Sequence, residues 1–234
     1  MKLQVEKLYQ ISKQPSRKII GLMSGTSLDG LDIACCELTG SGAETKLDVQ
    51  HFKTVPYSEE LKKHIRSIFA KRQIDFQTLC LLNPHIGKLH GQIVNQCLAE
   101  WNLQADEVDL IASHGQTVFH APKKQHQLEA FENATLQIGD GDHLAVTTGI
   151  ITISDFRQKN IAGGGEGAPL AVYGDYYLFS KKGENRILLN IGGIANFTLL
   201  PANLQVDDIF TTDTGPGNTL IDAYMRRLFR KPYD

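Results

Sequence analysis

Near its start, the 234-residue chain carries the segment Gly21-Leu22-Met23-Ser24-Gly25-Thr26-Ser27-Leu28-Asp29-Gly30-Leu31-Asp32. Lys18–Ile20 before it and Leu31–Leu38 after it predict two buried strands. A short turn of small residues presents backbone N–H groups and hydroxyls at one point, which suits an anion such as phosphate. An ordinary β-hairpin turn is the alternative. The segment is neither a Walker-A loop, because no Gly-Lys-Ser/Thr follows, nor a Gly-x-Gly-x-x-Gly motif.

The composition is typical of a globular protein, with 41% hydrophobic and 21% charged residues. The length allows one large domain or two of ordinary size. A net charge of −2 argues against a general nucleic-acid binder. Met1–Arg17 lacks the apolar run of a secretory signal, and no uninterrupted apolar run is long enough to cross a bilayer. We therefore expect neither nucleic acid nor a membrane as a partner.

The four cysteines are the adjacent pair Cys35-Cys36 together with Cys80 and Cys97, without a C-x-x-C motif. Neighbouring residues on a strand point to opposite faces, so the pair is a poor disulfide or metal clip. We interpret all four as reduced residues of a cytoplasmic protein.

An α/β pattern follows the first hairpin. Lys46–Val55 predicts a third antiparallel strand, and Ser58 can cap a helix with Glu59 and Glu60 in its first turn. The apolar face of that helix carries Leu61, Ile65, Ile68 and Phe69. Pro84 suits the first turn of another helix. The buried side of that helix carries Ile86, Leu89, Ile93, Cys97 and Trp101.

A short apolar strand, Val108–Ala112, then ends in Ser113-His114-Gly115-Gln116-Thr117. Three strands, a helix and a strand are the order in which an RNase-H-like sheet begins. From Val118 to Ile138 we expect a polar excursion, with an exposed turn at His120–Gln125 and a returning strand at Ala134–Ile138. Asp142–Thr148 predicts a short helix and Ile150–Ile153 a buried strand.

Glycine dominates the segment Ala162-Gly163-Gly164-Gly165-Glu166-Gly167-Ala168-Pro169. Such a segment is too flexible for the interior of a helix or strand. It predicts a hinge or active-site loop before a helix with Pro169 near its start. A flexible linker between lobes is the alternative, and one segment can serve both as a linker and as an active-site loop.

The second half repeats the order of the opening. Arg186–Leu200 is again an apolar strand, a glycine turn and an apolar strand, and Val206–Thr211 predicts another strand. That strand leads through Thr212-Asp213-Thr214-Gly215-Pro216-Gly217-Asn218 into a helix. The apolar face of the helix carries Leu220, Ile221, Tyr224, Met225 and Leu228. Asp213 is either a helix cap or, because two glycines and a proline separate it from the helix, a carboxylate free to face a cleft.

Two strand–turn–strand units resemble the duplicated architecture of the actin, Hsp70 and sugar-kinase superfamily. The motifs themselves resemble, in order, those of the anhydro-N-acetylmuramic acid kinase family. They are Gly21–Asp32, Ser113–Thr117, Asp155–Arg157, Gly164–Pro169, Asn190–Asn196 and Asp213–Asn218. The resemblance covers the chain from Lys18 to its end.

The resemblance implies an α/β fold of duplicated RNase-H-like lobes with mixed sheets. Residues 1–160 would form the first lobe, with the phosphate hairpin and sugar-site motifs. Residues 161–234 would begin the second lobe, with the catalytic aspartate loop. Members of the family are considerably longer, so we expect a truncated chain with an incomplete second lobe that is weakly active or inactive. Its last helix would then expose Leu220, Tyr224 and Leu228.

The implied activity is that of a phosphotransferase with an alcohol acceptor in peptidoglycan recycling. Such an enzyme takes 1,6-anhydro-N-acetylmuramic acid, ATP and water and gives N-acetylmuramic acid 6-phosphate and ADP. By its match to the family motif, Asp213 is the base that deprotonates the attacking water. Asp29 or Asp32 would hold Mg²⁺. The residues implied to bind ATP are Gly25, Thr26, Ser27, Leu28, Asp29, Gly30, Leu31, Asp32, Asn190, Gly192 and Gly193.

Polar side chains of the motifs are expected to bind the amino sugar. These residues are Ser24, His114, Gln116, Thr117, Arg157, Gly215 and Asn218. Arg157 suits the lactyl carboxylate of the sugar or a phosphate, with a surface ion pair as the alternative. His114 is equally compatible with a packed, hydrogen-bonded histidine. His120, His126 and His143 lack a spacing that indicates metal binding.

Two other classes remain open. A related sugar or acetate kinase would keep both hairpins, but the motifs Ser113–Thr117 and Asp155–Arg157 argue against it. A non-catalytic module that binds nucleotide or muropeptide is favoured by the short length. A homodimer is left open by the sequence.

Overall fold

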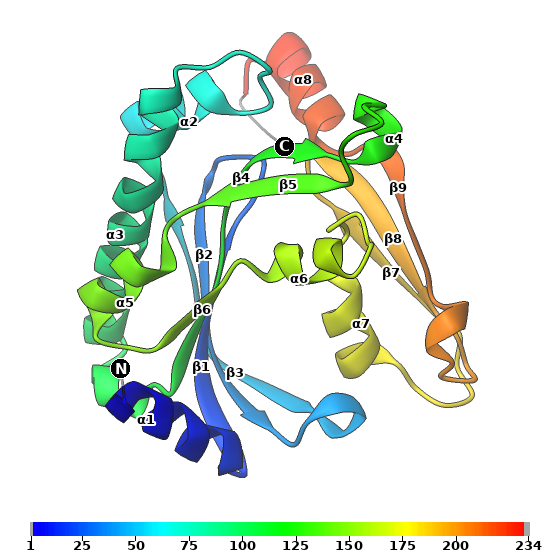
Figure 1. Cartoon of the computed structure of the whole chain (residues 1–234). Coiled ribbons are helices and arrows are strands. Elements are labelled where there is room, and N and C mark those ends of the chain that lie inside the picture. The colour runs from blue at the N-terminus through cyan, green and yellow to red at the C-terminus, as the bar shows by residue number, and fades with distance from the viewer. Residues whose placement is uncertain (1, 232–234) are drawn as a thin grey trace. The chain divides into compact units, whose positions relative to one another are not determined.

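The computed structural model describes residues 2–231 and divides into two compact units (Figure 1). Unit 1 comprises the described residues up to Ser41 together with Lys46–Ala168. Unit 2 comprises Gly42–Thr45 together with the described residues from Pro169 onward.

Unit 1 is built on a mixed sheet in the order β3-β2-β1-β4-β5, with β6 also paired to β4. The neighbours are antiparallel except β1–β4 and β4–β6, which are parallel. The strands are β1 (Ser16–Ser24), β2 (Gly30–Thr39), β3 (Lys46–Pro56), β4 (Leu110–Ala121), β5 (Ala134–Ile138) and β6 (Thr152–Ser154). The expected mixed α/β fold and the first strand–turn–strand unit are therefore confirmed.

Six α-helices accompany this sheet in the described part of unit 1, and Figure 1 shows α2, α3 and α5 along one side of it. They are α1 (Lys2–Lys13), α2 (Glu59–Ile68), α3 (Phe76–Glu100), α4 (Lys123–His126), α5 (Gly141–Thr148) and α6 (Phe156–Ala162). A 3-10 turn, η2 (Ala105–Glu107), precedes β4. None of the helices in residues 2–231 is long and apolar enough to span a membrane.

The hydrophobic core of unit 1 joins α2 and α3 to β1, β2 and β4. Ser58 Oγ accepts from the backbone N–H of Leu61 (3.2 Å) and so caps α2, as predicted. That helix buries Leu61, Ile65 and Ile68, while Phe69 is partly buried. Sequence periodicity therefore predicted this packing face correctly.

Pro84 does not lie in the first turn of a helix, contrary to our expectation; it lies inside α3. The helix begins two turns earlier, where Asp75 Oδ1 accepts from the N–H of Thr78 (2.5 Å). A proline there removes one helical hydrogen bond. Just before it, Leu82 is buried, and the backbone and side-chain oxygens of Asn83 accept from the N–H groups of Asp140 and Gly139, which joins α3 to the start of α5 at this point.

The Ser113–Thr117 motif lies inside β4 rather than after a short strand. The strand continues to Ala121 because β5, itself predicted correctly, pairs antiparallel with Gln116–Ala121. The expected exposed turn at His120–Gln125 is therefore strand up to Ala121, and α4 begins at Lys123. The partner strand, which lies far away in sequence, holds these polar residues in extended conformation.

Two further differences lie between β5 and unit 2. The predicted strand Ile150–Ile153 is replaced by β6, and Ile153 is 42% exposed while Ile150 is buried. Helix α6, directly after Asp155, was not predicted. Helix α5 was predicted, and Asp140 caps it through the N–H of His143 (2.9 Å).

Unit 2 contains an antiparallel sheet in the order β7-β8-β9, flanked in sequence by two helices. The elements are η1 (Gly42–Glu44), α7 (Val172–Phe179), β7 (Arg186–Ile191), β8 (Ile194–Leu200), η3 (Val206–Asp208), β9 (Phe210–Pro216) and α8 (Asn218–Phe229). The second strand–turn–strand unit is thus confirmed.

The strand predicted at Val206–Thr211 begins later, at Phe210, because Val206–Asp208 forms a 3-10 turn. Asn203 organises this turn: its Oδ1 accepts from the N–H of Gln205 (2.9 Å) and its Nδ2 donates to Asp208 Oδ2 (2.7 Å). The apolar side chains expected to be exposed on α8 are exposed, from Leu220 at 50% to Leu228 at 64%.

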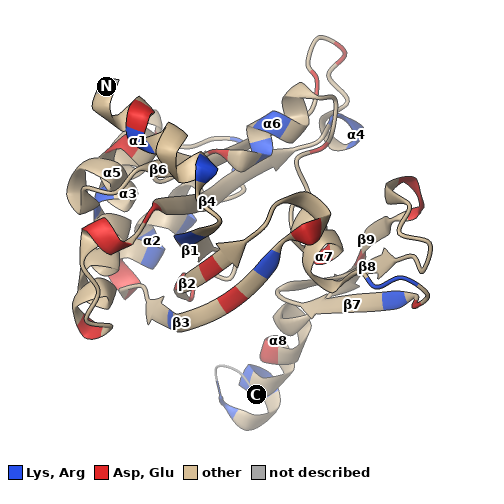
Figure 2. Ribbon diagram, turned by 90° about the horizontal axis from the view of Figure 1, so that it is seen from below, with Lys and Arg blue, Asp and Glu red and all other residues tan. Residues whose placement is uncertain are grey.

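Charge on the paired strands β2 and β3 of unit 1 has no dominant sign. Figure 2 shows only acidic residues on β2, whereas β3 carries both acidic and basic residues. This pattern agrees with the small net charge of −2.

The packing of α3 against α5 generates a stability prediction. A Cβ atom at Gly87 would overlap the carbonyl oxygen of Asp140, whereas one at Gly174 in α7 would meet nothing within 4 Å. We expect Gly87→Ala to destabilise the fold by about 1–3 kcal/mol, despite the higher helix propensity of alanine. Gly174→Ala, the matched helical control, should be neutral or stabilising by up to about 1 kcal/mol. Urea unfolding followed by far-UV circular dichroism tests both, and equal effects of the two changes would contradict the packing argument.

Candidate functional site

The turn Gly25–Asp29 joins β1 to β2 and has a strained backbone. Leu28 adopts a left-handed conformation (φ +58°), which is uncommon for a bulky residue, and its side chain is only 3% exposed. Thr26, Ser27 and Asp29 are exposed. The buried side chain of Leu28 therefore anchors the turn. A ligand that approaches the exposed hydroxyls of Thr26 and Ser27 can reach the backbone of Leu28 but not its side chain.

One carboxylate, Asp29, ends this turn, and a second, Asp32, follows it in β2. Asp29 Oδ1 accepts from Ser27 Oγ (2.7 Å) and from the N–H of Gly30 (3.0 Å), and Asp32 Oδ1 accepts from Thr54 Oγ1 (2.6 Å). Within residues 2–231, no group of three or more histidine, cysteine or acidic residues is arranged to hold a metal ion. Mg²⁺ commonly takes one or two carboxylates from protein and its other ligands from phosphate and water, and Asp29 and Asp32 are the carboxylates supplied here.

Strand β4 brings the Ser113–Thr117 motif beside this turn through a β-bulge. Leu22 of β1 pairs with Ser113, but Ser24 pairs with Gln116, so β4 contains one extra residue. Gly115 provides the required positive φ (+72°), and a Cβ there would lie 2.7 Å from the carbonyl oxygen of Ile138. Side chains along a strand normally alternate between its two faces. Because the bulge shifts this alternation by one residue, the side chains of both Ser113 and Gln116 are fully buried.

The fully buried side chains near the turn form a continuous hydrogen-bonded chain. Gln116 Nε2 donates to the carbonyl oxygens of Gly25 (3.1 Å) and Thr117 (3.0 Å). Ser24 Oγ donates to Gln116 Oε1 (2.5 Å), and Tyr57 Oη donates to Ser24 Oγ (2.8 Å). His90 Nε2 lies 2.8 Å from Tyr57 Oη. Ser24 and Gln116, both expected at the sugar site, thus contact each other.

Tyr57 and His90 of this chain were not predicted as site residues. Tyr57 lies between β3 and α2, and no motif marks it. His90 follows Ile86 by four residues and precedes Ile93 by three, so a polar residue on the buried face of α3 was the available signal. Burial lowers the pKa of His90 from 6.5 to about 4 and raises the pKa of Tyr57. Both side chains are therefore uncharged near neutral pH.

His114 and Arg157, which are far apart in sequence, are in direct contact. Arg157 Nε donates to His114 Nε2 (2.8 Å), and the other ring nitrogen, Nδ1, lies 2.8 Å from the carbonyl oxygen of Gly115. A carbonyl oxygen only accepts, so His114 is the neutral Nδ1–H tautomer. Burial, chiefly, and nearby Arg157 lower the pKa of His114. Among the described residues Arg157 forms no ion pair, so the surface ion pair considered for it is not observed.

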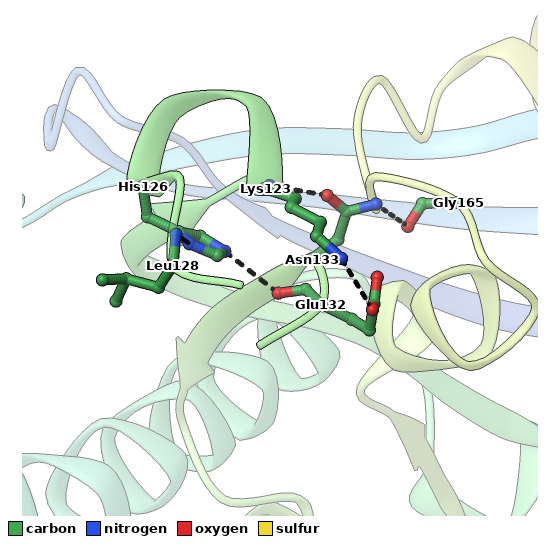
Figure 3. Close-up of polar contacts among 6 residues, drawn as sticks. All are labelled: Lys123, His126, Leu128, Glu132, Asn133 and Gly165. Atoms are coloured by element: carbon green, nitrogen blue, oxygen red, sulfur yellow. Dashed lines mark hydrogen bonds and ion pairs between the residues drawn. The ribbon is translucent and has the colours of Figure 1, made fainter. Parts of the chain in front are cut away.

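The glycine-rich segment is attached to the rest of unit 1 as far as Gly167. Asn133 Nδ2 donates to the carbonyl oxygen of Gly165 (3.0 Å), while Asn133 Oδ1 accepts from the N–H of Lys123 (2.7 Å) (Figure 3). Arg157 Nη1 donates to the carbonyl oxygen of Gly167 (2.5 Å). Lys124 and Glu166 form an ion pair (2.7 Å). These contacts favour an ordered loop beside Arg157 over a free linker for residues 163–167.

The α4 region that carries Asn133 is itself held by His126 (Figure 3). His126 Nδ1 accepts from the N–H of Leu128 (3.0 Å), so Nε2 donates to the carbonyl oxygen of Glu132 (3.1 Å). Lys123 Nζ pairs with the Glu132 carboxylate (2.8 Å). His126 therefore has a structural role in this loop.

In unit 2, the register of the sheet brings Asn190 and Asp213 into one row. Asn196 of β8 pairs with Asn190 of β7 on one side and with Asp213 of β9 on the other. Paired residues of neighbouring strands project on the same face of a sheet. Asp213 is exposed there, which leaves its carboxylate accessible.

The glycine turn of unit 2 supports the start of α8. The N–H groups of Gly217 and Asn218 donate to the carbonyl oxygens of Gly193 (3.0 Å) and Gly192 (2.7 Å), respectively. A Cβ at Gly217 would lie 2.5 Å from the Gly192 carbonyl oxygen, and Gly215 has a φ of +130°. The first N–H groups of α8 are therefore used within the protein, and the turn and the Asp213–Asn218 loop form one cluster.

Comparison with known proteins identifies the family. The sequence model described as anhydro-N-acetylmuramic acid kinase matches residues 17–234. The chain belongs to this family. The match confirms the resemblance drawn from the six motifs.

Three relatives in the family are named anhydro-N-acetylmuramic acid kinase. The protein from Pseudoalteromonas atlantica (strain T6c / ATCC BAA-1087) is 60% identical over 229 residues, covering 98% of this chain and 57% of the relative. The one from Pseudoalteromonas translucida (strain TAC 125) is 58% identical, covering 96% and 56%. The one from Clostridioides difficile (strain 630) is 42% identical, covering 92% and 55%. The chain thus spans a little over half the length of these curated relatives.

Buried His90 predicts a pH dependence of stability. Its folded pKa lies below the unfolded value, so the unfolded state binds more protons between pH 6.5 and about 4. The stability is fully present above pH 6.5 and is lost as the pH falls toward 4, by about 3 kcal/mol for this residue. Urea unfolding monitored through Trp101, the single tryptophan, measures this loss. His90→Gln, which cannot titrate, should flatten the profile in this range, and an unchanged slope would contradict the assignment.

Proposed function

We propose that this chain carries the residues for phosphorylating 1,6-anhydro-N-acetylmuramic acid with hydrolytic opening of the anhydro bridge. The observation that carries the proposal is the family match over residues 17–234, with all six motifs present. In the reaction, water adds its oxygen to the anomeric carbon, the bond from that carbon to O6 breaks, and O6 takes the γ-phosphoryl group of ATP. The products are N-acetylmuramic acid 6-phosphate and ADP, as peptidoglycan recycling requires. We place this reaction in the cytoplasm, where ATP is available.

Asp213 is proposed as the base that takes the proton of the attacking water. Its exposure in β9 and its position next to a glycine-containing loop support this role. An inverting glycosidase uses a carboxylate in the same way. We assign Gly215 and Asn218 of the same loop to the sugar.

The turn of unit 1 is proposed to bind the phosphates of ATP. Exposed Thr26 and Ser27 and the strained backbone at Leu28 support this, with Gly25 and Asp29–Asp32 completing the site. Asp29 or Asp32 would hold Mg²⁺, which supplies charge neutralisation for the transferred phosphoryl group when bound. Asn190, Gly192 and Gly193 are proposed to contribute from the second glycine turn.

Arg157 is proposed to bind the lactyl carboxylate of the sugar. Its partners in the described residues are the neutral ring of His114 and a backbone carbonyl, so no carboxylate of the protein neutralises its charge there. A half-buried guanidinium of this kind favours an anionic ligand. His114 and Thr117 would line the same pocket, with Ser24 and Gln116 behind them.

We propose that units 1 and 2, which divide between Ala168 and Pro169, correspond to the two sugar-kinase lobes expected from the sequence at residues 1–160 and 161–234. The strand order β3-β2-β1-β4-β6, with parallel β1–β4 and β4–β6 pairs, supports an RNase-H-like first lobe. The β7-β8-β9 meander repeats the antiparallel order of β1, β2 and β3, which supports duplication.

Replacement of the proposed base should abolish turnover. Incubation of the purified chain with Mg-ATP and 1,6-anhydro-N-acetylmuramic acid should give a sugar 6-phosphate detectable by mass spectrometry. Asp213→Asn should reduce its formation by at least about 10²-fold, because a general base contributes about that much. Exposed Asp207→Asn is the matched control and should retain activity. Product formation unaffected by Asp213→Asn would refute the assignment, and a folded chain that binds ligand without turnover would favour the binding-module alternative.

Arg157→Lys should weaken sugar binding selectively. Lysine keeps the charge but loses the planar fork that contacts His114 and Gly167 together. We expect about a tenfold to hundredfold loss of affinity for the anhydro sugar in calorimetric titration, with Mg-ATP affinity unchanged. Arg72→Lys, at an exposed position, is the control. Equal losses for sugar and nucleotide would contradict a sugar-specific role.

A further inference from the structure

The buried hydrogen-bonded chain behind the turn of unit 1 has only one permitted direction. Carbonyl oxygens only accept, so the amide nitrogen of Gln116 must face Gly25 and Thr117, and its oxygen must face Ser24. Ser24 therefore donates to Gln116. Tyr57 must then donate to Ser24, because the single proton of Ser24 is already used.

The same reasoning reaches His90. Since the hydroxyl proton of Tyr57 points to Ser24, Tyr57 Oη can only accept from His90 Nε2, which is 2.8 Å away. The two rings lie nearly parallel, 7° apart. His90 is consequently the Nε2–H tautomer, and its Nδ1 is a buried acceptor without a hydrogen-bond partner in the described residues.

Tyr57 also holds the opposite end of the turn. Its backbone N–H donates to the carbonyl oxygen of Asp29 (3.1 Å), while its side chain acts through Ser24 and Gln116 on the carbonyl oxygen of Gly25. Gly25 and Asp29 are the first and last residues of the turn. One buried residue therefore fixes both ends of this five-residue segment, one directly and one through two side chains.

We propose that His90 and Tyr57 are positioning residues that set the backbone orientation of the Gly25–Asp29 turn through this one-directional chain. The inference rests on the proposed function in one respect: it takes the turn as the segment that receives the phosphates of the nucleotide. Neither residue touches the nucleotide; both act through Ser24 and Gln116.

The unpartnered Nδ1 of His90 argues for this role over a purely packing role. A buried acceptor without a partner is unfavourable, and an apolar side chain at this core position would avoid that cost. What the imidazole supplies is a fixed donor at Nε2, which starts the chain. If that donor is removed, Tyr57 Oη loses the group from which it accepts, and the chain from Tyr57 through Ser24 and Gln116 to the turn loses its fixed buried end.

The test compares variants that keep and that break the chain. Tyr57→Phe removes the central hydroxyl, and His90→Leu removes the donor. His90→Gln keeps a donor, because the glutamine amide nitrogen can occupy the place of Nε2. Ser24→Ala breaks the chain at its middle and serves if Tyr57→Phe does not fold. The controls are Ile65→Val, which removes a methyl group from the same core, and Tyr176→Phe, which removes a hydroxyl bonded to Leu204 in unit 2.

Two readouts are measured on each folded variant. The first is the amide ¹H–¹⁵N signals of Gly25 and Thr26, together with the ring nitrogen shifts of His90 in the proteins that retain it. The second is the dissociation constant for Mg-ATP by calorimetric titration. Tyr57→Phe and His90→Leu should displace the turn signals and weaken Mg-ATP binding by about tenfold, the effect of one lost buried hydrogen bond. His90→Gln should restore both to near wild-type values, and the controls should change neither.

The proposal is overturned if the turn signals move no more in Tyr57→Phe than in Ile65→Val. It is also overturned if His90→Gln and His90→Leu behave alike, or if the wild-type ring of His90 proves to be the Nδ1–H tautomer. If the wild-type chain does not bind Mg-ATP, the proposed nucleotide site fails, while the Gly25, Thr26 and His90 signals still decide whether the chain orients the turn.

Discussion

The parallel pairing of β1 with β4, interrupted by one bulge, is the constraint on which the site of unit 1 depends. Strand β1 ends at Ser24, which pairs with Gln116 inside β4, so the turn after β1 and the Ser113–Thr117 motif lie side by side. The extra residue in β4 then turns both Ser113 and Gln116 inward, while His114 is left half-buried beside Arg157. Without the positive φ of Gly115, the register on both sides could not be kept.

Local patterns predicted those elements whose signals are local. Both glycine turns, the Ser58 cap and the apolar face of α2 follow from residues close together in sequence. The exceptions involve specific hydrogen-bonding partners. β4 is extended by β5, α3 runs through Pro84 where Asn83 binds Gly139 and Asp140, and Asn203 binds Asp208 across the 3-10 turn. Each depends on a partner that periodicity does not reveal.

In the candidate site too, the sequence motifs identified some residues, whereas the contacts between distant segments are known only from the structure. The motifs identified the turn, His114 and Arg157 as residues of interest, but not that His114 and Arg157 touch across 43 positions. Tyr57 and His90 were missed because their contacts join segments 33 positions apart, and the Ser24–Gln116 bond spans 92. A hydrogen-bonded chain of this kind is a property of the tertiary fold, so sequence spacing carries no trace of it beyond a polar residue on an apolar helix face.

The two glycine turns share an order of elements but are held by different means. In unit 1, side chains hold the turn: Tyr57 and Gln116 bind the carbonyl oxygens at its two ends. In unit 2, the backbone of Gly217 and Asn218 binds the carbonyl oxygens of Gly192 and Gly193, which occupies the start of α8. A helix N-terminus used in this way does not offer those N–H groups to phosphate. Any anion bound there must be recognised by the turn itself.

Backbone atoms also decide the protonation pattern of the buried and half-buried histidines. The carbonyl of Gly115 makes Nδ1 the donor in His114, which leaves Nε2 to accept from Arg157. In His126, the N–H of Leu128 makes Nδ1 the acceptor, so Nε2 is the donor to the carbonyl oxygen of Glu132. For His90, the carbonyl groups of Gly25 and Thr117 act at a distance, through three intervening side chains. For His114 and His90, a second ring proton would place a donor where the fold or a neighbour supplies no acceptor, so the neutral ring of these two residues is part of the structure.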